Sequence, residues 1–130
     1  MIRILLADDN PAVRSYLRGL LEQQEGWCVC DEASDGVDAV RRFEKGHHDL
    51  IVLDFQMPEM NGLEAAKRII RESPETPILM VTLYPSTQLS AEARKVGIKG
   101  TCPKTHISSV VDAVAALLRQ ETYFPSVISP

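Results

Sequence analysis

The sequence has few cysteines, no long apolar run and no block of basic residues. Its three cysteines, Cys28, Cys30 and Cys102, are odd in number and form no CxxC motif, which favours reduced thiols in a cytoplasmic protein over a disulfide framework. The purely apolar runs are far shorter than the roughly 20 residues that span a bilayer, so we expect no membrane segment. The net charge is −4 without a Lys/Arg cluster, which argues against direct nucleic-acid binding by this domain.

The length of 130 residues is typical of one domain with a single core. Apolar residues make up 45% and charged residues 25%, as in ordinary globular proteins, so a disordered chain is excluded. From about Glu121 onward the helical periodicity is lost and two prolines follow, Pro125 and Pro130. We therefore expect a domain over residues 1–120, and over residues 121–130 a C-terminal tail or the start of a linker.

Apolar runs of strand length recur five times and are mostly unbroken, which is typical of parallel strands covered on both faces. We predict strands over Ile2–Ala7, Trp27–Cys30, Asp49–Leu53, Ile78–Thr82 and Ile98–Cys102. Amphipathic helical patterns follow the strands, opening at Asn10-Pro11, Ser34-Asp35, Asn61-Gly62, about Thr87 and about Val110. Strict strand–helix alternation predicts an α/β fold with a doubly wound five-stranded parallel sheet, a flavodoxin-like (βα)5 three-layer sandwich.

Polar side chains stand where these predicted strands end. Asp8 and Asp9 follow the first strand, Asp54 the third, Thr82 ends the fourth, and Lys104 comes just past the fifth. Ligands of an open parallel sheet bind at the carboxyl ends of its strands, so we expect these side chains to meet on one rim. Asp9 alone could be a helix cap, but the conjunction of five such residues favours a functional site.

Three neighbouring carboxylates repel one another unless a cation shares them. The predicted rim offers oxygen ligands and no His or Cys, which selects a hard ion such as Mg²⁺. A carboxylate beside Mg²⁺ and a lysine is placed to attack a phosphoryl group, because both cations stabilise charge on its oxygens. Asp54 is the best candidate for that nucleophile.

With these residues in place, the sequence resembles the receiver domains of two-component response regulators over about residues 2–120. The resemblance rests on the acidic pair Asp8-Asp9, on Asp54 at the start of DFQMPEMNG, on Thr82 and on Lys104, with matching spacings. The tail sequence Tyr-Phe-Pro-Ser is similar to linkers of the LuxR-type helix-turn-helix group. This resemblance implies a role in phosphorelay signalling, with transcription as the output.

The resemblance implies a role for each of these residues. Asp54 would accept a phosphoryl group from a sensor histidine kinase. Asp9, Asp54 and the backbone carbonyl of Gln56 would bind Mg²⁺, with Asp8 assisting through water. Lys104 would pair with the phosphoryl oxygens, and Thr82 would swing toward them.

The resemblance also implies an output surface, formed by the fourth helix, fifth strand and fifth helix over about residues 86–119. This surface could pair two copies or contact an output domain, and DNA would be bound through a C-terminal output domain beyond this sequence. Catalysis would be limited to the domain's own phosphorylation and dephosphorylation, so we do not expect an enzyme in the ordinary sense.

The sequence departs from the receiver pattern at several positions. The usual aromatic residue three before Lys104 is Thr101, and the residue after Lys104 is Thr105 where many members have proline. Leu83 follows Thr82 where a small residue is usual. Gln56 and Tyr84 occupy the positions that flank the path of the hydrolytic water, so we predict that they tune the phosphoryl lifetime.

Two alternatives remain. A Mg²⁺-dependent phosphatase of the haloacid dehalogenase kind would need a second Asp two residues beyond Asp54, where this chain has Gln56, and also a cap segment. A receiver-like protein-interaction domain that works without phosphorylation is kept open by Thr101, Leu83 and Thr105. The intact acids, Thr82 and Lys104 argue against it.

The remaining chemistry-bearing residues are interpreted as structural. His47 and His48 follow Gly46 before a strand, and we interpret the pair as a solvated loop rather than a metal site. Cys28 and Cys30 lie two apart on a strand and are interpreted as packing residues. His106 is expected near the start of the fifth helix.

Overall fold

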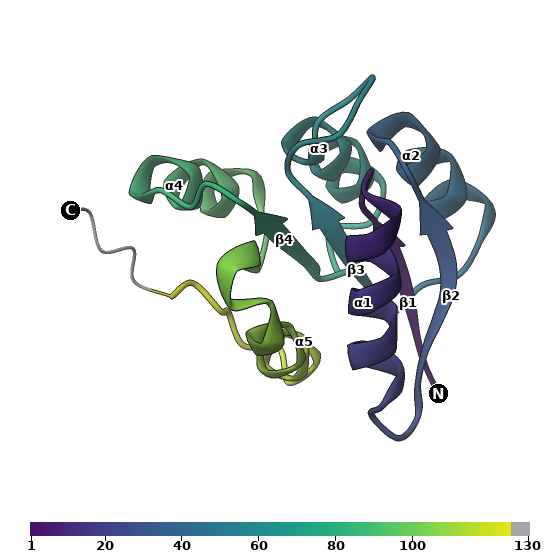
Figure 1. Cartoon of the computed structure of the whole chain (residues 1–130). Coiled ribbons are helices and arrows are strands. Elements are labelled where there is room, and N and C mark those ends of the chain that lie inside the picture. Colours follow the sequence, from purple (N-terminus) through teal and green to yellow (C-terminus); the bar gives the residue numbers. More distant parts are fainter. Residues whose placement is uncertain (126–130) are drawn as a thin grey trace.

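The computed structural model describes residues 1–125, and its centre is a five-stranded, all-parallel sheet (Figure 1). The strand order is β2-β1-β3-β4-β5, as expected for a doubly wound sheet. The strands are β1 (Ile2–Ala7), β2 (Trp27–Ala33), β3 (Leu50–Asp54), β4 (Ile78–Thr82) and β5 (Gly100–Pro103). No helix within these 125 residues has the length and apolar character to cross a membrane.

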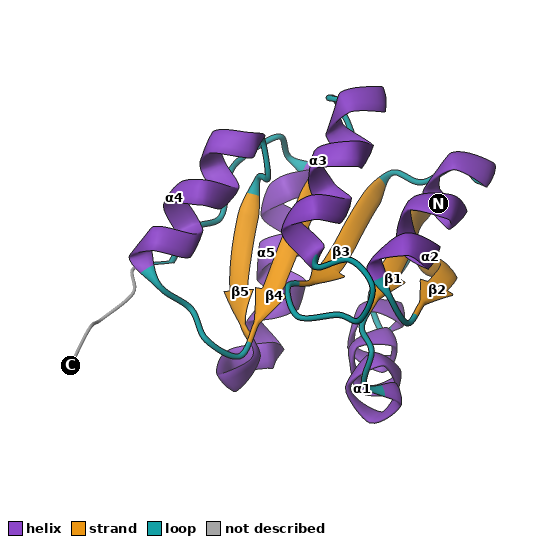
Figure 2. Ribbon diagram, turned by 90° about the horizontal axis from the view of Figure 1, so that it is seen from above, coloured by secondary structure: helices purple, strands orange, loops and turns teal. Residues whose placement is uncertain are grey.

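Five α-helices cover the two faces of the sheet. They are α1 (Pro11–Glu22), α2 (Gly36–Lys45), α3 (Gly62–Glu72), α4 (Thr87–Val96) and α5 (Val110–Leu118), with a short 3₁₀ segment, η1 (Lys104–Ser109), before α5. One core joins α1 and α5 to the sheet, and a second joins α2, α3 and α4 to the opposite face (Figure 2). The predicted three-layer architecture is confirmed.

Local sequence signals set the helix ends. The Asn10 side chain accepts hydrogen bonds from the first free amides of α1, and Pro11 occupies the position where no amide is needed. Asp35 and Ser86 cap α2 and α4 in the same way. Gly97 ends α4 at φ 103°, a left-handed conformation that favours glycine. These ends fix the loops that carry the rim residues.

Three of the five predicted strands have different boundaries in the structure, and β5 also ends one residue later than predicted, at Pro103. β2 extends to Ala33, because an edge strand needs only its backbone ladder and tolerates the charged Glu32, which pairs with Arg14 of α1. β3 runs one residue later than predicted. β5 begins at Gly100 rather than Ile98, because the Ile98 amide still bonds to the C-terminal turn of α4 while its side chain is buried.

The segment after α5 runs along the edge of β5. The Tyr123 amide donates to Lys99 O at 2.9 Å, and the Thr101 amide donates to Tyr123 O at 2.8 Å. A side chain at Gly100 would lie 2.8 Å from Tyr123 O, so glycine permits this approach. Tyr123 packs on the α1/α5 core, whereas Phe124 packs on the α2/α3/α4 core. Residues 126–130 of the predicted tail lie outside the described residues.

Candidate functional site at the carboxyl ends of the strands

The three predicted carboxylates meet in the crevice between β1 and β3. The chain leaves β1 toward α1 on one face and leaves β3 toward α3 on the other, so the crevice is the switch point of the doubly wound sheet. Oxygens of Asp8, Asp9 and Asp54 lie within 4.8 Å of one another. Asp8 and Asp54 are buried and Asp9 is exposed. Asp9 is therefore the one of the three acids whose side chain solvent reaches readily.

Lys104 completes this cluster from the other end of the chain. Its ammonium nitrogen lies 3.0 Å from Asp8 Oδ2 and 3.1 Å from Asp54 Oδ2, and its side chain is 9% exposed. η1 begins at Lys104, directly after β5, so the fifth strand positions this charge. One buried cation thus faces two buried anions.

The electrostatics of the cluster are dominated by burial. Burial raises the pKa of Asp54 to about 6, and the negative charge of Asp8 adds to this shift. The contact with Lys104 and the hydrogen bond from the backbone amide of Gln56 lower the pKa and so oppose the shift. Burial lowers the pKa of Lys104, but its contacts with Asp8 and Asp54 outweigh that effect and leave the pKa above its usual value. Asp54 is therefore mostly ionised at neutral pH, close to its titration range.

The free oxygens of the cluster fit a hard divalent cation. Asp8 Oδ1 accepts a hydrogen bond from the backbone amide of Asn10 at 2.9 Å, and Asp54 Oδ1 accepts one from the backbone amide of Gln56 at 3.3 Å. The Oδ2 atoms of both acids are buried, and among residues 1–125 they have no hydrogen-bond partner; only the Lys104 ammonium lies within ion-pair distance. Carboxylate oxygens with spare lone pairs, including those of the exposed Asp9, are the ligands that Mg²⁺ prefers.

The loop after Asp54 is held close to the strand end. The Gly62 amide donates to Phe55 O at 2.8 Å, and a side chain at Gly62 would lie only 2.4 Å from Asp54 O. Asn61 caps α3 by accepting from the Glu64 amide at 2.9 Å. The Asn61-Gly62 pair thus allows α3 to start against the backbone of the candidate phosphoacceptor.

Thr82 ends β4 at the same rim and is 1% exposed. Its hydroxyl oxygen accepts from the Tyr84 amide at 3.1 Å. The neighbouring Leu83 and Tyr84 side chains are 48% and 69% exposed. The hydroxyl is therefore held by its own loop, and its reorientation would release the Tyr84 amide.

A cavity of about 500 Å³ borders Thr82 and opens between α4 and η1. Its lining includes Leu89 of α4, Thr101 of β5, His106 of η1 and Tyr123 of the segment after α5. Thr101 is buried and pairs with Met80 of β4. His106 lies in the 3₁₀ segment rather than in α5, which refines its predicted place at the start of the fifth helix.

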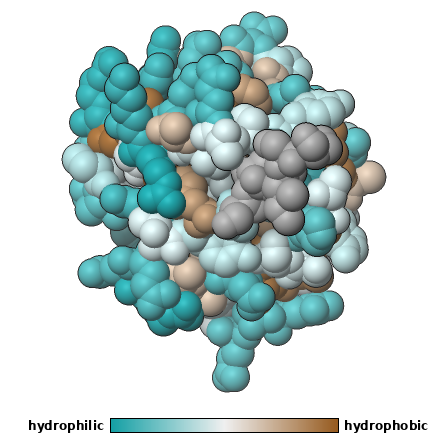
Figure 3. Space-filling model, turned by 90° about the vertical axis from the view of Figure 1, so that its left-hand side faces the viewer, coloured by the Kyte–Doolittle hydropathy of each residue, from teal (hydrophilic) through white to brown (hydrophobic). Residues whose placement is uncertain are grey.

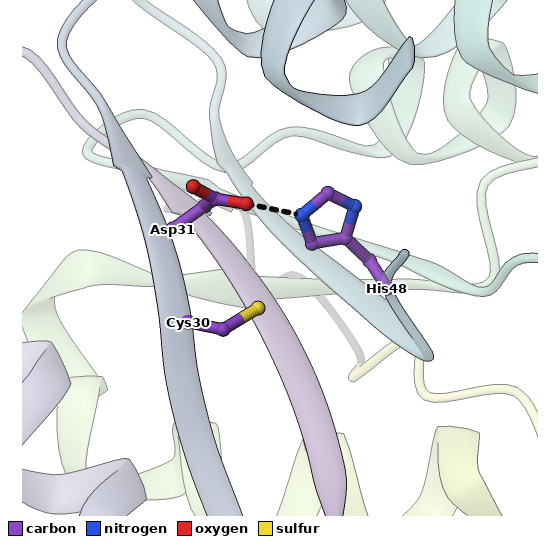
Figure 4. Close-up of side chains that lie close together, drawn as sticks. All are labelled: Cys30, Asp31 and His48. Carbon is purple, nitrogen blue, oxygen red and sulfur yellow. Dashed lines mark hydrogen bonds and ion pairs between the residues drawn. The ribbon is translucent and has the colours of Figure 1, made fainter. Parts of the chain in front are cut away.

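Sequence reasoning missed a second cluster on β2 and the turn before β3. The prediction of a solvated loop is wrong for His48, whose side chain is 0% exposed and whose Nε2 lies 2.7 Å from Asp31 Oδ2 (Figure 4). His47 is 80% exposed, as predicted. His48 stacks on Phe43 of α2, with ring centroids 6.0 Å apart. An apolar Phe43 on the predicted second helix is a signal that could have indicated a partner for His48.

The comparisons with known proteins agree with this fold. The family model described as the response regulator receiver domain matches residues 4–116. The chain is 34% identical to the response regulator UvrY of Escherichia coli K12 over 130 residues, covering 99% of this chain and 60% of UvrY. It is 35% identical to the transcriptional regulatory protein YxjL of Bacillus subtilis over 127 residues, covering 97% of this chain and 58% of YxjL. The chain thus spans less than two thirds of these curated relatives.

Two solved structures are similar over nearly the whole chain. A LuxR-family two-component response regulator from Aurantimonas sp. SI85-9A1 has a TM-score of 0.89 at 30% identity, covering 93% of this chain and 87% of that one. The isolated receiver domain of RcsB from Salmonella enterica, solved with the phosphomimetic BeF3−, has a TM-score of 0.87 at 25% identity, covering 96% and 94%.

Proposed function

This chain belongs to the family of response regulator receiver domains, and we propose that a sensor histidine kinase phosphorylates it on Asp54 in a Mg²⁺-dependent step. The observation that carries the proposal is the buried triad in which Lys104 lies within 3.1 Å of both Asp8 and Asp54, beside the exposed Asp9. This arrangement places a nucleophilic carboxylate, a fixed positive charge and the ligands for a hard cation within one crevice.

In the proposed transfer, a carboxylate oxygen of Asp54 attacks the phosphorus as the bond to the donor imidazole nitrogen breaks. The nucleophile is already ionised above its pKa of about 6, so no base is needed, and the released imidazole takes its proton from solvent. Lys104 is placed to pair with a phosphoryl oxygen. Before transfer Lys104 pairs with the Asp54 carboxylate; after transfer it would pair with the phosphoryl group that Asp54 carries.

Mg²⁺ would be held by Asp9, Asp54 and the backbone carbonyl of Gln56, with Asp8 assisting through water. Bound there, the ion neutralises charge on the phosphoryl oxygens during transfer. Asp8 is also fixed by the Asn10 amide. Lys104 balances only part of the negative charge of Asp8 and Asp54, and the bound ion would balance more of it.

Phosphorylation would act through a population shift between two arrangements of the Thr82 loop. In one arrangement the Thr82 hydroxyl accepts from the Tyr84 amide; in the other it donates to the phosphoryl group, and the β4–α4 loop follows. The cavity beside Thr82 runs to α4, β5 and η1, so this movement would reach the surface formed by α4, β5 and α5. That surface could pair two copies of the domain.

We infer that the regulated process is transcription in the cytoplasm. YxjL is named a transcriptional regulatory protein, and the Aurantimonas structure is of a LuxR-family regulator. Both names support an output at the level of transcription, and in this proposal DNA would be bound through a C-terminal output domain rather than by the receiver itself. The visible part of the face in Figure 3 is mostly hydrophilic, with hydrophobic residues in small separate areas.

The test is incubation of the purified chain with Mg²⁺ and acetyl phosphate, followed by intact-mass measurement. We expect the gain of one phosphoryl group, which requires Mg²⁺ and is lost in Asp54→Asn. If no phosphoryl group is gained, titration with beryllofluoride tests the site without a bulky donor. A null result in both would favour the receiver-like interaction domain that needs no phosphate, an alternative that Thr101, Leu83 and Thr105 support.

A further inference from the structure

A second group of ligating side chains lies near the opposite end of β3 from Asp54. Cys30 and Asp31 of β2 and His48 of the turn before β3 each offer one ligand atom, and these three atoms lie within 4.8 Å of one another (Figure 4). We propose that they form a binding site for a divalent transition-metal ion, with Zn²⁺ as the best fit. The site is separate from the acidic crevice and serves the stability of the β2 edge.

A β-bulge creates the site. Ile4 pairs with Val29 and Leu5 pairs with Asp31, so Cys30 is an extra residue with no partner of its own on β1. Side chains of a regular strand alternate between faces, and a bulge breaks that alternation.

The neighbouring residues fix which face the two ligands share. Val29 packs in the α1/α5 core and Ala33 in the α2/α3/α4 core, while Glu32 pairs with Arg14 of α1. Asp31 therefore faces α2, and the bulge turns Cys30 to that side as well. The thiol of Cys30 and the carboxylate of Asp31 therefore lie on the same side of β2, close to His48.

His48 is held in place before any metal binds. Its side chain is 0% exposed and stacks on Phe43. Gly46 packs on the ring edge, since a side chain there would lie 2.8 Å from Cε1. Nε2 already faces Asp31 Oδ2 at 2.7 Å, while the other oxygen of Asp31 faces Arg42 at 3.6 Å. Arg42 would remain as the outer partner of a metal-bound Asp31.

The donor set of one sulfur, one nitrogen and one oxygen suits tetrahedral Zn²⁺. Bond lengths of about 2.3 Å to sulfur and about 2.0 Å to nitrogen and oxygen require the Nε2–Oδ2 distance to open to roughly 3.3 Å. Three protein ligands leave the fourth position for water, on the side where Asp31 is 27% exposed.

Binding rearranges two protons. The Cys30 thiol loses its proton to solvent as the Zn–S bond forms, and the ring proton of His48 moves from Nε2 to Nδ1. Nδ1 is buried and has no hydrogen-bond partner within residues 1–125. This tautomer therefore carries a cost, and we expect weaker binding than at structural sites with four protein ligands.

The test is a Co²⁺ titration of the whole chain in the presence of excess Mg²⁺. A sulfur-to-cobalt charge-transfer band with tetrahedral d–d bands, saturating at one ion per chain, is the expected result. The acidic crevice contains no thiol and cannot produce that band. Cys30→Ser and His48→Gln should abolish it, and the neighbouring variants Cys28→Ser and His47→Gln should keep it.

A second measurement does not depend on the spectrum. Zn²⁺ should raise the melting temperature of the unaltered chain and of Cys28→Ser by several degrees, and leave Cys30→Ser unchanged. Absence of the charge-transfer band at excess Co²⁺, or a band that survives Cys30→Ser, would overturn the proposal. If His48→Gln fails to fold, the comparison of Cys30→Ser with Cys28→Ser still decides it.

Discussion

The ammonium of Lys104 lies 3.1 Å from Oδ2 of Asp54, at a depth where Asp54 is 3% exposed. This contact limits the cost of burying a carboxylate beside Asp8 but does not remove it, because the pKa of Asp54 remains raised to about 6. The site is therefore electrostatically strained without a divalent cation, and its properties should depend on pH and on the charge at position 54.

Asp54→Asn should stabilise the metal-free domain at pH 7. The folded-state pKa of about 6 lies above the ordinary value of 3.8, so the ionised group costs folding free energy above pH 6. This cost disappears as pH falls from 6 toward 3.8. The gain should be on the order of 2 kcal/mol at pH 7 and much smaller at pH 4.5.

Urea unfolding of both proteins at the two pH values, without Mg²⁺, measures this difference. The exposed Asp9→Asn is the matched control and should gain less. An equal gain at both pH values would mean that ionisation of Asp54 is not the cause.

Tyr84→Ala should shorten the lifetime of the phosphorylated domain several-fold. Tyr84 is 69% exposed and its backbone amide donates to Thr82; the receiver resemblance implies that its ring flanks the path of the attacking water. Gln56→Ala should also change the rate, because Gln56 flanks the other side of that path. The rate of dephosphorylation is measured as loss of the phosphoryl group after the phosphodonor is removed. Tyr16→Ala is the control, because Tyr16 is an exposed tyrosine on α1. Unchanged rates in both variants would contradict the prediction.

Gly62→Ala should destabilise the domain by about 2 kcal/mol and reduce phosphorylation. The new methyl group would lie 2.4 Å from Asp54 O, so α3 or the candidate phosphoacceptor must shift. Gly19→Ala is the opposite control: nothing lies within 4 Å at that position, which is inside α1. There alanine should stabilise by about 1 kcal/mol. Chemical denaturation of both variants would refute the argument if the two changes had the same sign.

A chain that ends at Gln120 should be less stable than one that ends at Pro125, by about 2 kcal/mol. The shorter chain loses the two backbone hydrogen bonds of Tyr123 and the packing of Phe124, whose ring lies 4.0 Å from the Arg94 guanidinium. Thermal unfolding of the two chains measures the difference. Equal stability would support residue 120 as the end of the folded domain.

Much of this molecule is determined by its sequence. Asn10-Pro11 and Asn61-Gly62 start helices through hydrogen bonds to amides two or three residues further on, so these helix starts can be predicted from the local sequence. The convergence of Asp8, Asp54 and Lys104 also follows from the pattern, because the carboxyl ends of parallel strands share one edge.

Only the tertiary structure decided features that depend on contacts between distant segments. The bulge at Cys30 depends on the register between β2 and β1, and no residue type in β2 predicts it. Burial of His48 depends on Phe43 and Asp31, which two other elements bring to it. The addition of Tyr123 to β5 depends on the open sheet edge and on Gly100. Periodicity reports which face a residue covers, whereas register and edge pairing are settled only when the strands come together.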